Sequence, residues 1–410
     1  MSILNLTRTP ITLADSSSID AFGRLRVSSP ENIFDSKQLF DKQPLKWDEE
    51  ITGTGSSTHS QDKACVLMNN GVTNGNIILR QTFRAMNYQP GKSQLFEMTF
   101  AMGASDANCV REVGQFDDDN GVFFRYSNVA SFVLRSKASG SVVETVVNQS
   151  NWNLDKLDGT GASGITLNPN GTNIFFYDYQ WLGVGRVRYG FVIDGVPVIC
   201  HEINNANAGQ TTVFMSTPNL PLRYRIENTA TLSSAITMSH ICSTVFQEGG
   251  QSFVGSTFGV TSAAGTNKVR LGFNNQLVSV VKIRIKSGFK GANVIIDNVE
   301  ILSEEATSRI IRFAGVCNPT YSGGSDSWTS VSNSAVEFDF TSERVVTGAD
   351  VFHFESFGGS RVQQNVATDQ DSPIYLGHDI AGNSQVFALV AERLTSNNTD
   401  VFGAINWKEL

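Results

Sequence analysis

Three adjacent carboxylates make the segment Phe116–Gly121 the most acidic part of the chain. Asp117, Asp118 and Asp119 offer the oxygen ligands that Ca²⁺ prefers in proteins. An EF-hand loop, however, places its acids at alternate positions and ends on a distant glutamate, and neither feature occurs here. We therefore expect a turn between two strands, with a calcium site as the alternative.

Nucleophilic and acid–base residues occur without a recognisable catalytic signature. The five histidines lie outside known local motifs, and no Gly-x-Ser-x-Gly is present. In Cys200-His201-Glu202, successive strand residues point to opposite faces, so we expect a buried Cys200 and an outward His201. A glycosidase needs two carboxylates about 5–10 Å apart across a cleft. Glu202, Asp178 and Asp194 could supply them, but sequence spacing does not show it. We expect no enzymatic activity.

Two glycine-rich segments have compositions that could bind a ligand. Residues 151–161 are polar and suit a solvated loop, with sugar or cation binding as the alternative. Gly183–Arg188 has the glycine spacing of a phosphate loop, but such a loop must open a helix whose amide groups receive the phosphate. A strand pattern follows here, so we expect no nucleotide site. The sequence predicts no cofactor and no bound metal.

The composition of the chain limits the classes of partner and the cellular environment that we expect for it. The net charge is −8, from 31 basic and 39 acidic residues, which gives no electrostatic footprint for nucleic acid. No window approaches the roughly 18 apolar residues of a membrane helix, so we expect no membrane insertion. The beginning of the sequence does not resemble a signal peptide. The five cysteines include no CxxC pair and are expected to be buried, reduced thiols.

Most of the chain carries the alternation typical of β-strands. From Val187 to Ile193 every second residue is large and apolar, and Asp194-Gly195 then precedes another strand-like run. Asp-Gly between two such runs is a strong hairpin signal. Similar runs recur at short intervals, while helical signal is slight. The pattern predicts an all-β protein built of antiparallel sandwiches.

The predicted organisation has three parts. Residues 1–60 form an extended N-terminal arm, residues 61–248 a main β-sandwich and residues 253–410 a second β-sandwich, joined by Gly249–Ser252. The arm carries spaced large apolar residues that it cannot bury on itself, so it must lie along its own domain or a neighbouring subunit. The expected oligomer or anchor contacts are Phe22, Arg24, Leu25, Arg26, Phe34, Phe40 and Trp47.

A basic stripe, Lys282, Arg284 and Lys286, alternates with Val281, Ile283 and Ile285. Alternation places the three basic residues on one face of a strand. We expect a solvated strand face, with an acidic partner subunit as the functional alternative.

Several strings together resemble a family of tailed-phage virion proteins. They are Asp20–Ser28, Phe34–Gln38, Gln81–Arg84 and Asn87–Ser93, continuing through residues 152–164, 181–194, 215–224, 240–250 and 406–410. The resemblance covers most of the first 250 residues and implies a structural, tail-fibre-like or appendage protein of the virion. It carries no catalytic residues over. The hairpin Phe191–Val196 is also similar to one in concanavalin-like lectin sandwiches, of the jelly-roll kind.

Three functions follow as hypotheses. The first is an oligomeric fibre- or appendage-type virion component anchored through its arm, most simply a homotrimer. The second is a capsid decoration, connector or adaptor protein that grips other virion proteins. The third is a tail protein that binds or depolymerises a host-surface glycan. In each case the protein is made in the bacterial host cytoplasm and ends in the virion. Removal of residues 1–48 is expected to leave soluble sandwiches that no longer assemble.

Overall fold

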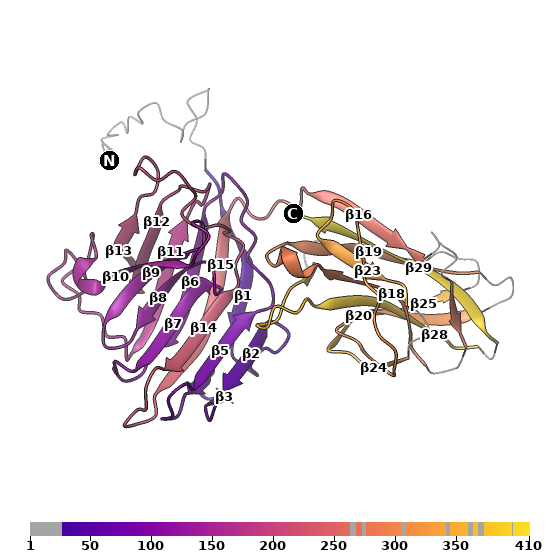
Figure 1. Cartoon of the computed structure of the whole chain (residues 1–410), viewed down its shortest axis with the longest axis horizontal. Coiled ribbons are helices and arrows are strands. Elements are labelled where there is room, and N and C mark those ends of the chain that lie inside the picture. The colour runs from indigo at the N-terminus through magenta and orange to yellow at the C-terminus, as the bar shows by residue number, and fades with distance from the viewer. Residues whose placement is uncertain are drawn as a thin grey trace, which may run out of the picture.

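The computed structural model describes residues 27–262, 268–272, 276–304, 309–341, 345–359, 364–367, 373–395 and 397–410. Two bodies of strands lie side by side along the long axis of the molecule (Figure 1). We call residues 27–248 the first sandwich and the part from residue 253 onward the second sandwich. Every strand pairing between named strands is antiparallel, so the predicted all-β class with antiparallel sandwiches is confirmed.

The first sandwich consists of two large sheets. The eight-stranded sheet has the order β13-β12-β11-β6-β15-β4-β3, with β1 beside β15. Its strands are β1 (Pro30–Lys37), β3 (Ser56–Ser60), β4 (Cys65–Asn69), β6 (Gln94–Ala101), β11 (Thr172–Tyr179), β12 (Val187–Ile193), β13 (Val196–Ile203) and β15 (Thr237–Glu248). The seven-stranded sheet has the order β10-β9-β8-β7-β14-β5-β2. Its strands are β2 (Trp47–Thr52), β5 (Ile77–Thr82), β7 (Cys109–Phe116), β8 (Gly121–Tyr126), β9 (Ala130–Ser136), β10 (Val143–Asn148) and β14 (Leu222–Asn228).

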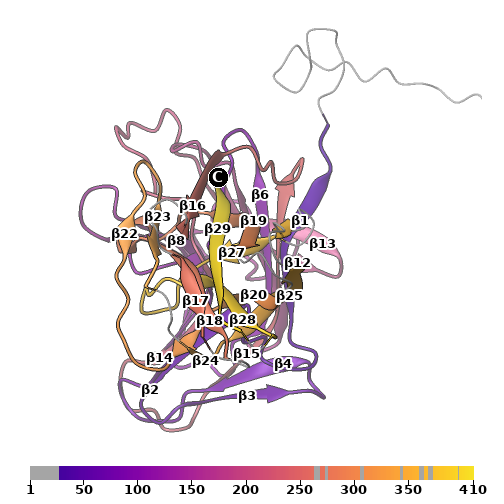
Figure 2. The ribbon, with the colours of Figure 1, turned by 90° about the vertical axis from the view of Figure 1, so that its right-hand side faces the viewer.

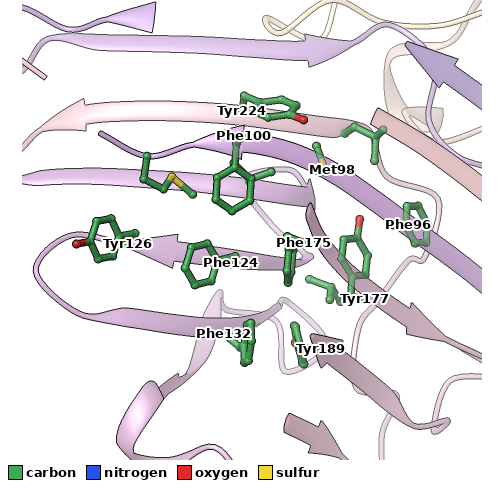
Figure 3. Close-up of a cluster of buried hydrophobic side chains, with 14 of the residues drawn as sticks. Phe96, Met98, Phe100, Phe124, Tyr126, Phe132, Phe175, Tyr177, Tyr189 and Tyr224 are labelled. Atoms are coloured by element: carbon green, nitrogen blue, oxygen red, sulfur yellow. The ribbon is translucent and has the colours of Figure 1, made fainter. Parts of the chain in front are cut away.

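Aromatic side chains fill the space between these two sheets. Because side chains alternate along a strand, each sheet turns one set of rings inward (Figure 3). Phe96 stacks on Tyr177 with ring centroids 4.6 Å apart, and Phe132 stacks on Tyr189 at 4.8 Å. Such ring pairs contribute about 0.5–1.5 kcal/mol beyond their burial. The predicted hairpin after Ile193 is the β12–β13 pair.

The predicted arm boundary at residue 60 differs from the structure. Strands β1, β2 and β3 all lie within residues 30–60 and pair with β15, β5 and β4 of the first sandwich. Two of the apolar anchors, Phe34 and Trp47, therefore pack on their own domain, which was one of the two positions that the sequence left open. Trp47 is buried in the core, where its ring lies 4.5 Å from that of His240.

The second sandwich also has two main sheets, seen end-on in Figure 2. In the β29 sheet the strands are β16 (Ser256–Thr261), β17 (Val269–Leu271), β19 (Val294–Ser303), β26 (Gln364–Ala367), β27 (Ile374–Leu376) and β29 (Thr399–Glu409). In the β28 sheet they are β18 (Val278–Ile285), β20 (Ile310–Cys317), β22 (Thr329–Ser330), β23 (Val336–Asp339), β25 (Val351–Gly359) and β28 (Val386–Arg393). Strands β21 (Thr320–Tyr321) and β24 (Val346–Gly348) pair separately. Short 3₁₀ turns occupy Gln149–Asn151 and Ser287–Phe289.

The cysteines form no disulfide. All five are free, and all but Cys242 are buried. Cys200 is buried, as expected, but the expectation of an outward His201 needs a correction, because its side chain is also buried. A bulge between Tyr189 and Gly190 leaves Cys200 as the extra residue opposite β12, which breaks the strict alternation. No helix in the described ranges is long and apolar enough to cross a membrane.

Candidate functional site

A charged groove lies on the outer face of the seven-stranded sheet. It has a volume of about 620 Å³ and is lined by side chains from β7, β8, β9, β10 and β14. Strand register creates its central row, in which Arg225, Glu112 and Arg125 stand directly opposite one another across three neighbouring strands. Two rows further along the same face, Arg135 lies opposite Glu144. Cross-strand pairs of opposite charge stabilise such a face.

Glu112 is the buried centre of this groove. Its side chain is only 1% exposed, and it accepts ion pairs from Arg125 at 2.7 Å and from Arg225 at 3.1 Å. Burial acts to lower the pKa of each guanidinium, but the neighbouring carboxylates leave both pKa values raised. Arg225 also binds Glu227 at 2.6 Å. The charged side chains of this row therefore hold one another in fixed positions.

Glu144 closes the groove at the sheet edge. Its carboxylate binds Arg125 and Arg135, each at 2.8 Å. Burial acts to raise the pKa of Glu144, but the hydrogen bonds from the two arginines outweigh it and lower the pKa. Both Arg135 and Arg125 lie over buried aromatic rings of the outer face; the Arg135 Cζ is 5.0 Å from the centroid of Phe123. The aromatic floor is consequently covered by guanidinium groups rather than open to solvent.

The acidic turn connects β7 to β8, as the sequence predicts, and its three carboxylates point to different partners. Asp117 accepts the backbone N–H groups of Asp119 and Asn120, at 2.8 and 2.7 Å. Asp118 binds Arg223 at 2.8 Å, and Asp119 binds Lys137 at 2.8 Å. In the part of the chain that the structure describes, no group of three or more His, Cys, Asp or Glu side chains could hold a metal.

A carboxylate within the loop at residues 151–161 holds that loop in its conformation. Asp155 is 5% exposed and accepts the backbone N–H groups of Leu157 at 2.9 Å and Ser163 at 2.7 Å. These bonds lower the pKa of Asp155 although burial acts to raise it. The carboxylate thus holds the loop in shape.

The predicted anchor residues fall into three groups. Phe22, Arg24, Leu25 and Arg26 lie outside the described residues. Trp47 and Phe34 face their own sandwich: the Trp47 Nε1 donates to Ser36 Oγ at 2.7 Å, and the half-buried Phe34 packs against the core. Phe40 is 83% exposed on the connection between β1 and β2. Of the described anchors, Phe40 is the one whose ring remains available to a partner.

Three of the strings that carry the resemblance, Gln81–Arg84, Asn87–Ser93 and residues 215–224, have contacts at the junction of the two sandwiches. In Gln81–Arg84, at the end of β5, the carbonyl of Phe83 accepts the backbone N–H of His378 at 3.0 Å. The contact is close, since a Cβ added at Gly377 would lie 2.2 Å from that same carbonyl oxygen. Asn219 of the segment 215–224 donates to the Gly291 carbonyl at 3.2 Å. These segments bind the second sandwich directly.

The linker between the sandwiches is bound by the same strings. The backbone N–H of Ser252 donates to Gln89 Oε1 at 2.8 Å, and Lys92 Nζ donates to the Gly250 carbonyl. Arg84 donates to Gln251 Oε1 at 3.0 Å. The linker is therefore fixed to the first sandwich along its length.

Sequence reasoning missed the groove residues Glu112, Arg125, Arg135 and Arg225. The signal that could have found them is alternation: in β14, Arg223 and Arg225 alternate with the core residues Leu222, Tyr224 and Ile226. What the sequence does not contain is the strand register that brings Glu112 between two of them.

Comparisons with known proteins give structural likeness only. No known protein family and no curated protein matches the sequence. A β-glucanase of Bacillus licheniformis is similar over 53% of this chain and 98% of its own, with 9% identity and a TM-score of 0.33. A legume lectin-like domain from Entamoeba histolytica covers 53% of this chain and 98% of its own, at 7% identity and a TM-score of 0.31. The CBM2 module of an evolved Dit from Lactobacillus casei BL23 phage J-1 covers 55% of this chain and 100% of its own, at 9% identity and a TM-score of 0.34.

Proposed function

We propose that the protein is a structural component of a tailed-phage virion, an oligomeric subunit of the fibre or appendage type. It is made in the host cytoplasm and incorporated into the particle. The observation that carries this proposal is the junction: three of the strings that resemble the virion family, Gln81–Arg84, Asn87–Ser93 and residues 215–224, bind the linker or the second sandwich to the first. A subunit whose two sandwiches are fixed to each other suits a virion component that transmits position or force within the particle.

The oligomer contact in this proposal includes the β1–β2 connection. Besides Phe40, the side chains of Leu39 and Leu45 are 40% and 60% exposed there. Three large apolar side chains are thus exposed within seven residues of one connection, which suits a segment that a protein partner covers. Residues 1–26 precede this region in the chain. The proposed assembly is a homotrimer in which the N-terminal region contacts the neighbouring subunit.

Particle composition tests this function. The phage or prophage whose genome encodes the chain is induced, and its particles are purified by density gradient and analysed by mass spectrometry and immunogold labelling. The proposal expects the chain in the particles, with label on a tail or baseplate appendage. Label spread over the capsid would favour the decoration protein, and label at the neck would favour the connector or adaptor. If the chain is found only in the lysate and not in the particles, the appendage, decoration and connector functions are all contradicted.

A second candidate function is binding of a host-surface glycan, and the charged groove favours it. Guanidinium and carboxylate groups provide the fixed donors and acceptors that recognise hydroxyl groups. A glycan array with the purified full chain tests it, with Arg225→Ala as the groove variant and Arg186→Ala, exposed on β11–β12, as the control. Saturable binding that Arg225→Ala removes and Arg186→Ala preserves supports the site. An absence of saturable binding contradicts it.

We propose binding rather than hydrolysis for this groove. A glycosidase needs one carboxylic acid that remains protonated, with a raised pKa. Here arginines lower the pKa of Glu144 and of Asp118, against the effect of burial. Burial raises the pKa of Glu97, but that residue lies on β6 of the other sheet.

A further inference from the structure

The basic stripe of the second sandwich is satisfied within its own domain. Arg284 on β18 binds Glu337 at 2.7 Å, and Lys286, directly after β18, donates to the carbonyls of Val331 and Ser334 at 2.9 and 2.7 Å. The third member, Lys282, differs from both. Its side chain is 0% exposed, although it lies on the outer face of the β28 sheet.

Lys282 lies between two aspartates. Its Nζ is 2.8 Å from Oδ2 of Asp339, whose side chain is 1% exposed, and 2.7 Å from Oδ1 of Asp326, which is 33% exposed. Asp339 is directly opposite Lys282 in the β18–β23 pair. The rings of Tyr321 and Trp328 cover the ammonium group, with centroids at 4.9 and 5.7 Å. Water is thus excluded from an amine and a carboxyl group that are held in contact.

Backbone groups prepare the Asp339 carboxyl group for attack. The N–H of Ser327 donates to Oδ2 at 3.0 Å, and the N–H of Thr341 donates to Oδ1. Donors fixed on a carboxyl group stabilise the negative charge that develops when a nucleophile adds to its carbon. Holding the two reactants in contact replaces a bimolecular encounter with an intramolecular step.

We propose that Lys282 and Asp339 condense to an intramolecular isopeptide bond, with Asp326 as the residue that relays the proton. A proton passes from Nζ to Asp326 and on to the Asp339 carboxyl group, and the neutral amine attacks Cγ. The new bond is Nζ–Cγ and the broken bond is one Cγ–O. The departing oxygen takes two protons that began on Nζ and leaves as one water molecule. No oxidant or co-reactant is needed, and charge balances because one ammonium and one carboxylate become a neutral amide.

The roles of the two aspartates follow from their surroundings. Asp339 has both oxygens fixed and its side chain is closed off, which suits the group that is consumed. Asp326 has contact with solvent, which suits a group that takes up and releases a proton. In the ion pair, Lys282 and the backbone donors lower the pKa of Asp339 against the effect of burial, so the Asp339 carboxylate resists the protonation that the condensation requires. The reaction is therefore a slow, single event during maturation of the chain. The bond would fix β23 to β18 covalently, in keeping with a part that bears load.

Mass spectrometry of the folded, full-length protein tests the bond. The intact mass should lie about 18 Da, one water, below the sequence mass, calculated with and without the initiating Met. A succinimide at Asp194-Gly195 would lose the same mass, so the loss must map by tryptic digestion. The bond predicts peptide 271–284, uncleaved at Lys282, joined to peptide 313–344, with fragment ions that place the link at Asp339 rather than Asp326.

Variants separate the roles. Lys282→Met and Asp326→Asn should both show the full sequence mass. Asp339→Asn can still condense, releasing ammonia, and should lose about 17 Da instead. Lys286→Met, on the same strand face, should keep the water loss as the matched control. A folded wild-type chain at its sequence mass, with peptides 271–282 and 313–344 unlinked, overturns the proposal, as does a loss that persists in Lys282→Met. Since the wild-type digest alone decides, a variant that fails to fold does not weaken the test.

Discussion

The guanidinium of Arg84 lies over the ring of Tyr375, with its Cζ 3.6 Å from the ring centroid. Arg84 belongs to the first sandwich and Tyr375 to the second. The same guanidinium donates to the Ile33 carbonyl at 2.9 Å and to Gln251 of the linker. One side chain therefore joins the N-terminal strand, the linker and both sandwiches.

Arg84→Ala is expected to loosen the junction while each sandwich remains folded. The variant loses a desolvated cation–π contact of about 2 kcal/mol and the hydrogen bonds to Ile33 and Gln251. Small-angle X-ray scattering should show a larger radius of gyration and a broader distance distribution. Arg186→Ala, whose side chain is 52% exposed and pairs within the first sandwich, is the control. Scattering from Arg84→Ala that superposes on the wild type would contradict the role assigned to this residue.

Glu112→Gln is expected to destabilise the first sandwich by about 2 kcal/mol, because two arginines lose a buried charged acceptor. Urea unfolding followed by tryptophan fluorescence measures this. Glu227→Gln removes a 27%-exposed partner of Arg225 and should cost less than about 1 kcal/mol. Equal costs for the two variants would mean that the groove is not organised around Glu112.

His378 should make stability depend on pH between 6.5 and 4. Burial, and secondly the charge of Lys290, lower its pKa from 6.5 to about 4, while Asp379 acts in the opposite direction. The unfolded chain then binds a proton that the folded chain does not, so this contribution to stability is present above pH 6.5 and is lost as pH falls through the window. Urea unfolding across this range should show a smaller fall for His378→Asn. Parallel curves for variant and wild type would show that His378 does not titrate in this way.

The sequence predicted the sheets better than it predicted the site. Alternation over Val187–Ile193 and the Asp-Gly turn depend on neighbouring residues, so the β12–β13 hairpin could be read directly. Residues 30–60 were assigned to an arm, because a strand that completes a distant sheet looks like any extended segment; β1 pairs with β15 more than 200 residues away.

The groove and the Lys282 site depend on register between strands far apart in the chain. Glu112 and Arg225 are 113 positions apart, and Lys282 and Asp339 are opposite only because β18 pairs with β23. Alternation places a residue on a face but does not say which strand lies beside it. The basic stripe was therefore recognised as a face, while its partners were not.

Trp47 and Phe40 should behave in opposite ways when changed to alanine. Trp47→Ala removes a buried ring and its bond to Ser36, and should cost about 3–5 kcal/mol. Phe40→Ala should change the unfolding free energy of the subunit by no more than about 0.5 kcal/mol, and yet weaken the oligomer. Thermal unfolding and dilution-dependent light scattering together measure both effects. An oligomer unaffected by Phe40→Ala would remove this residue from the proposed contact.

Removal of residues 1–48 is not expected to leave the first sandwich intact, contrary to the expectation from the sequence, because it would delete β1 and the buried Trp47. A chain that starts at residue 27 keeps every described strand. The central claim, an oligomeric structural subunit, is tested most directly by multi-angle light scattering behind a sizing column, on the full chain and on this shorter chain. If the protein is a homotrimer, the molar mass of the full chain should be about three times 44.6 kDa, and the chain that starts at residue 27 should have the mass of a single chain. A molar mass of 44.6 kDa for the full-length chain at every concentration would contradict the oligomeric subunit.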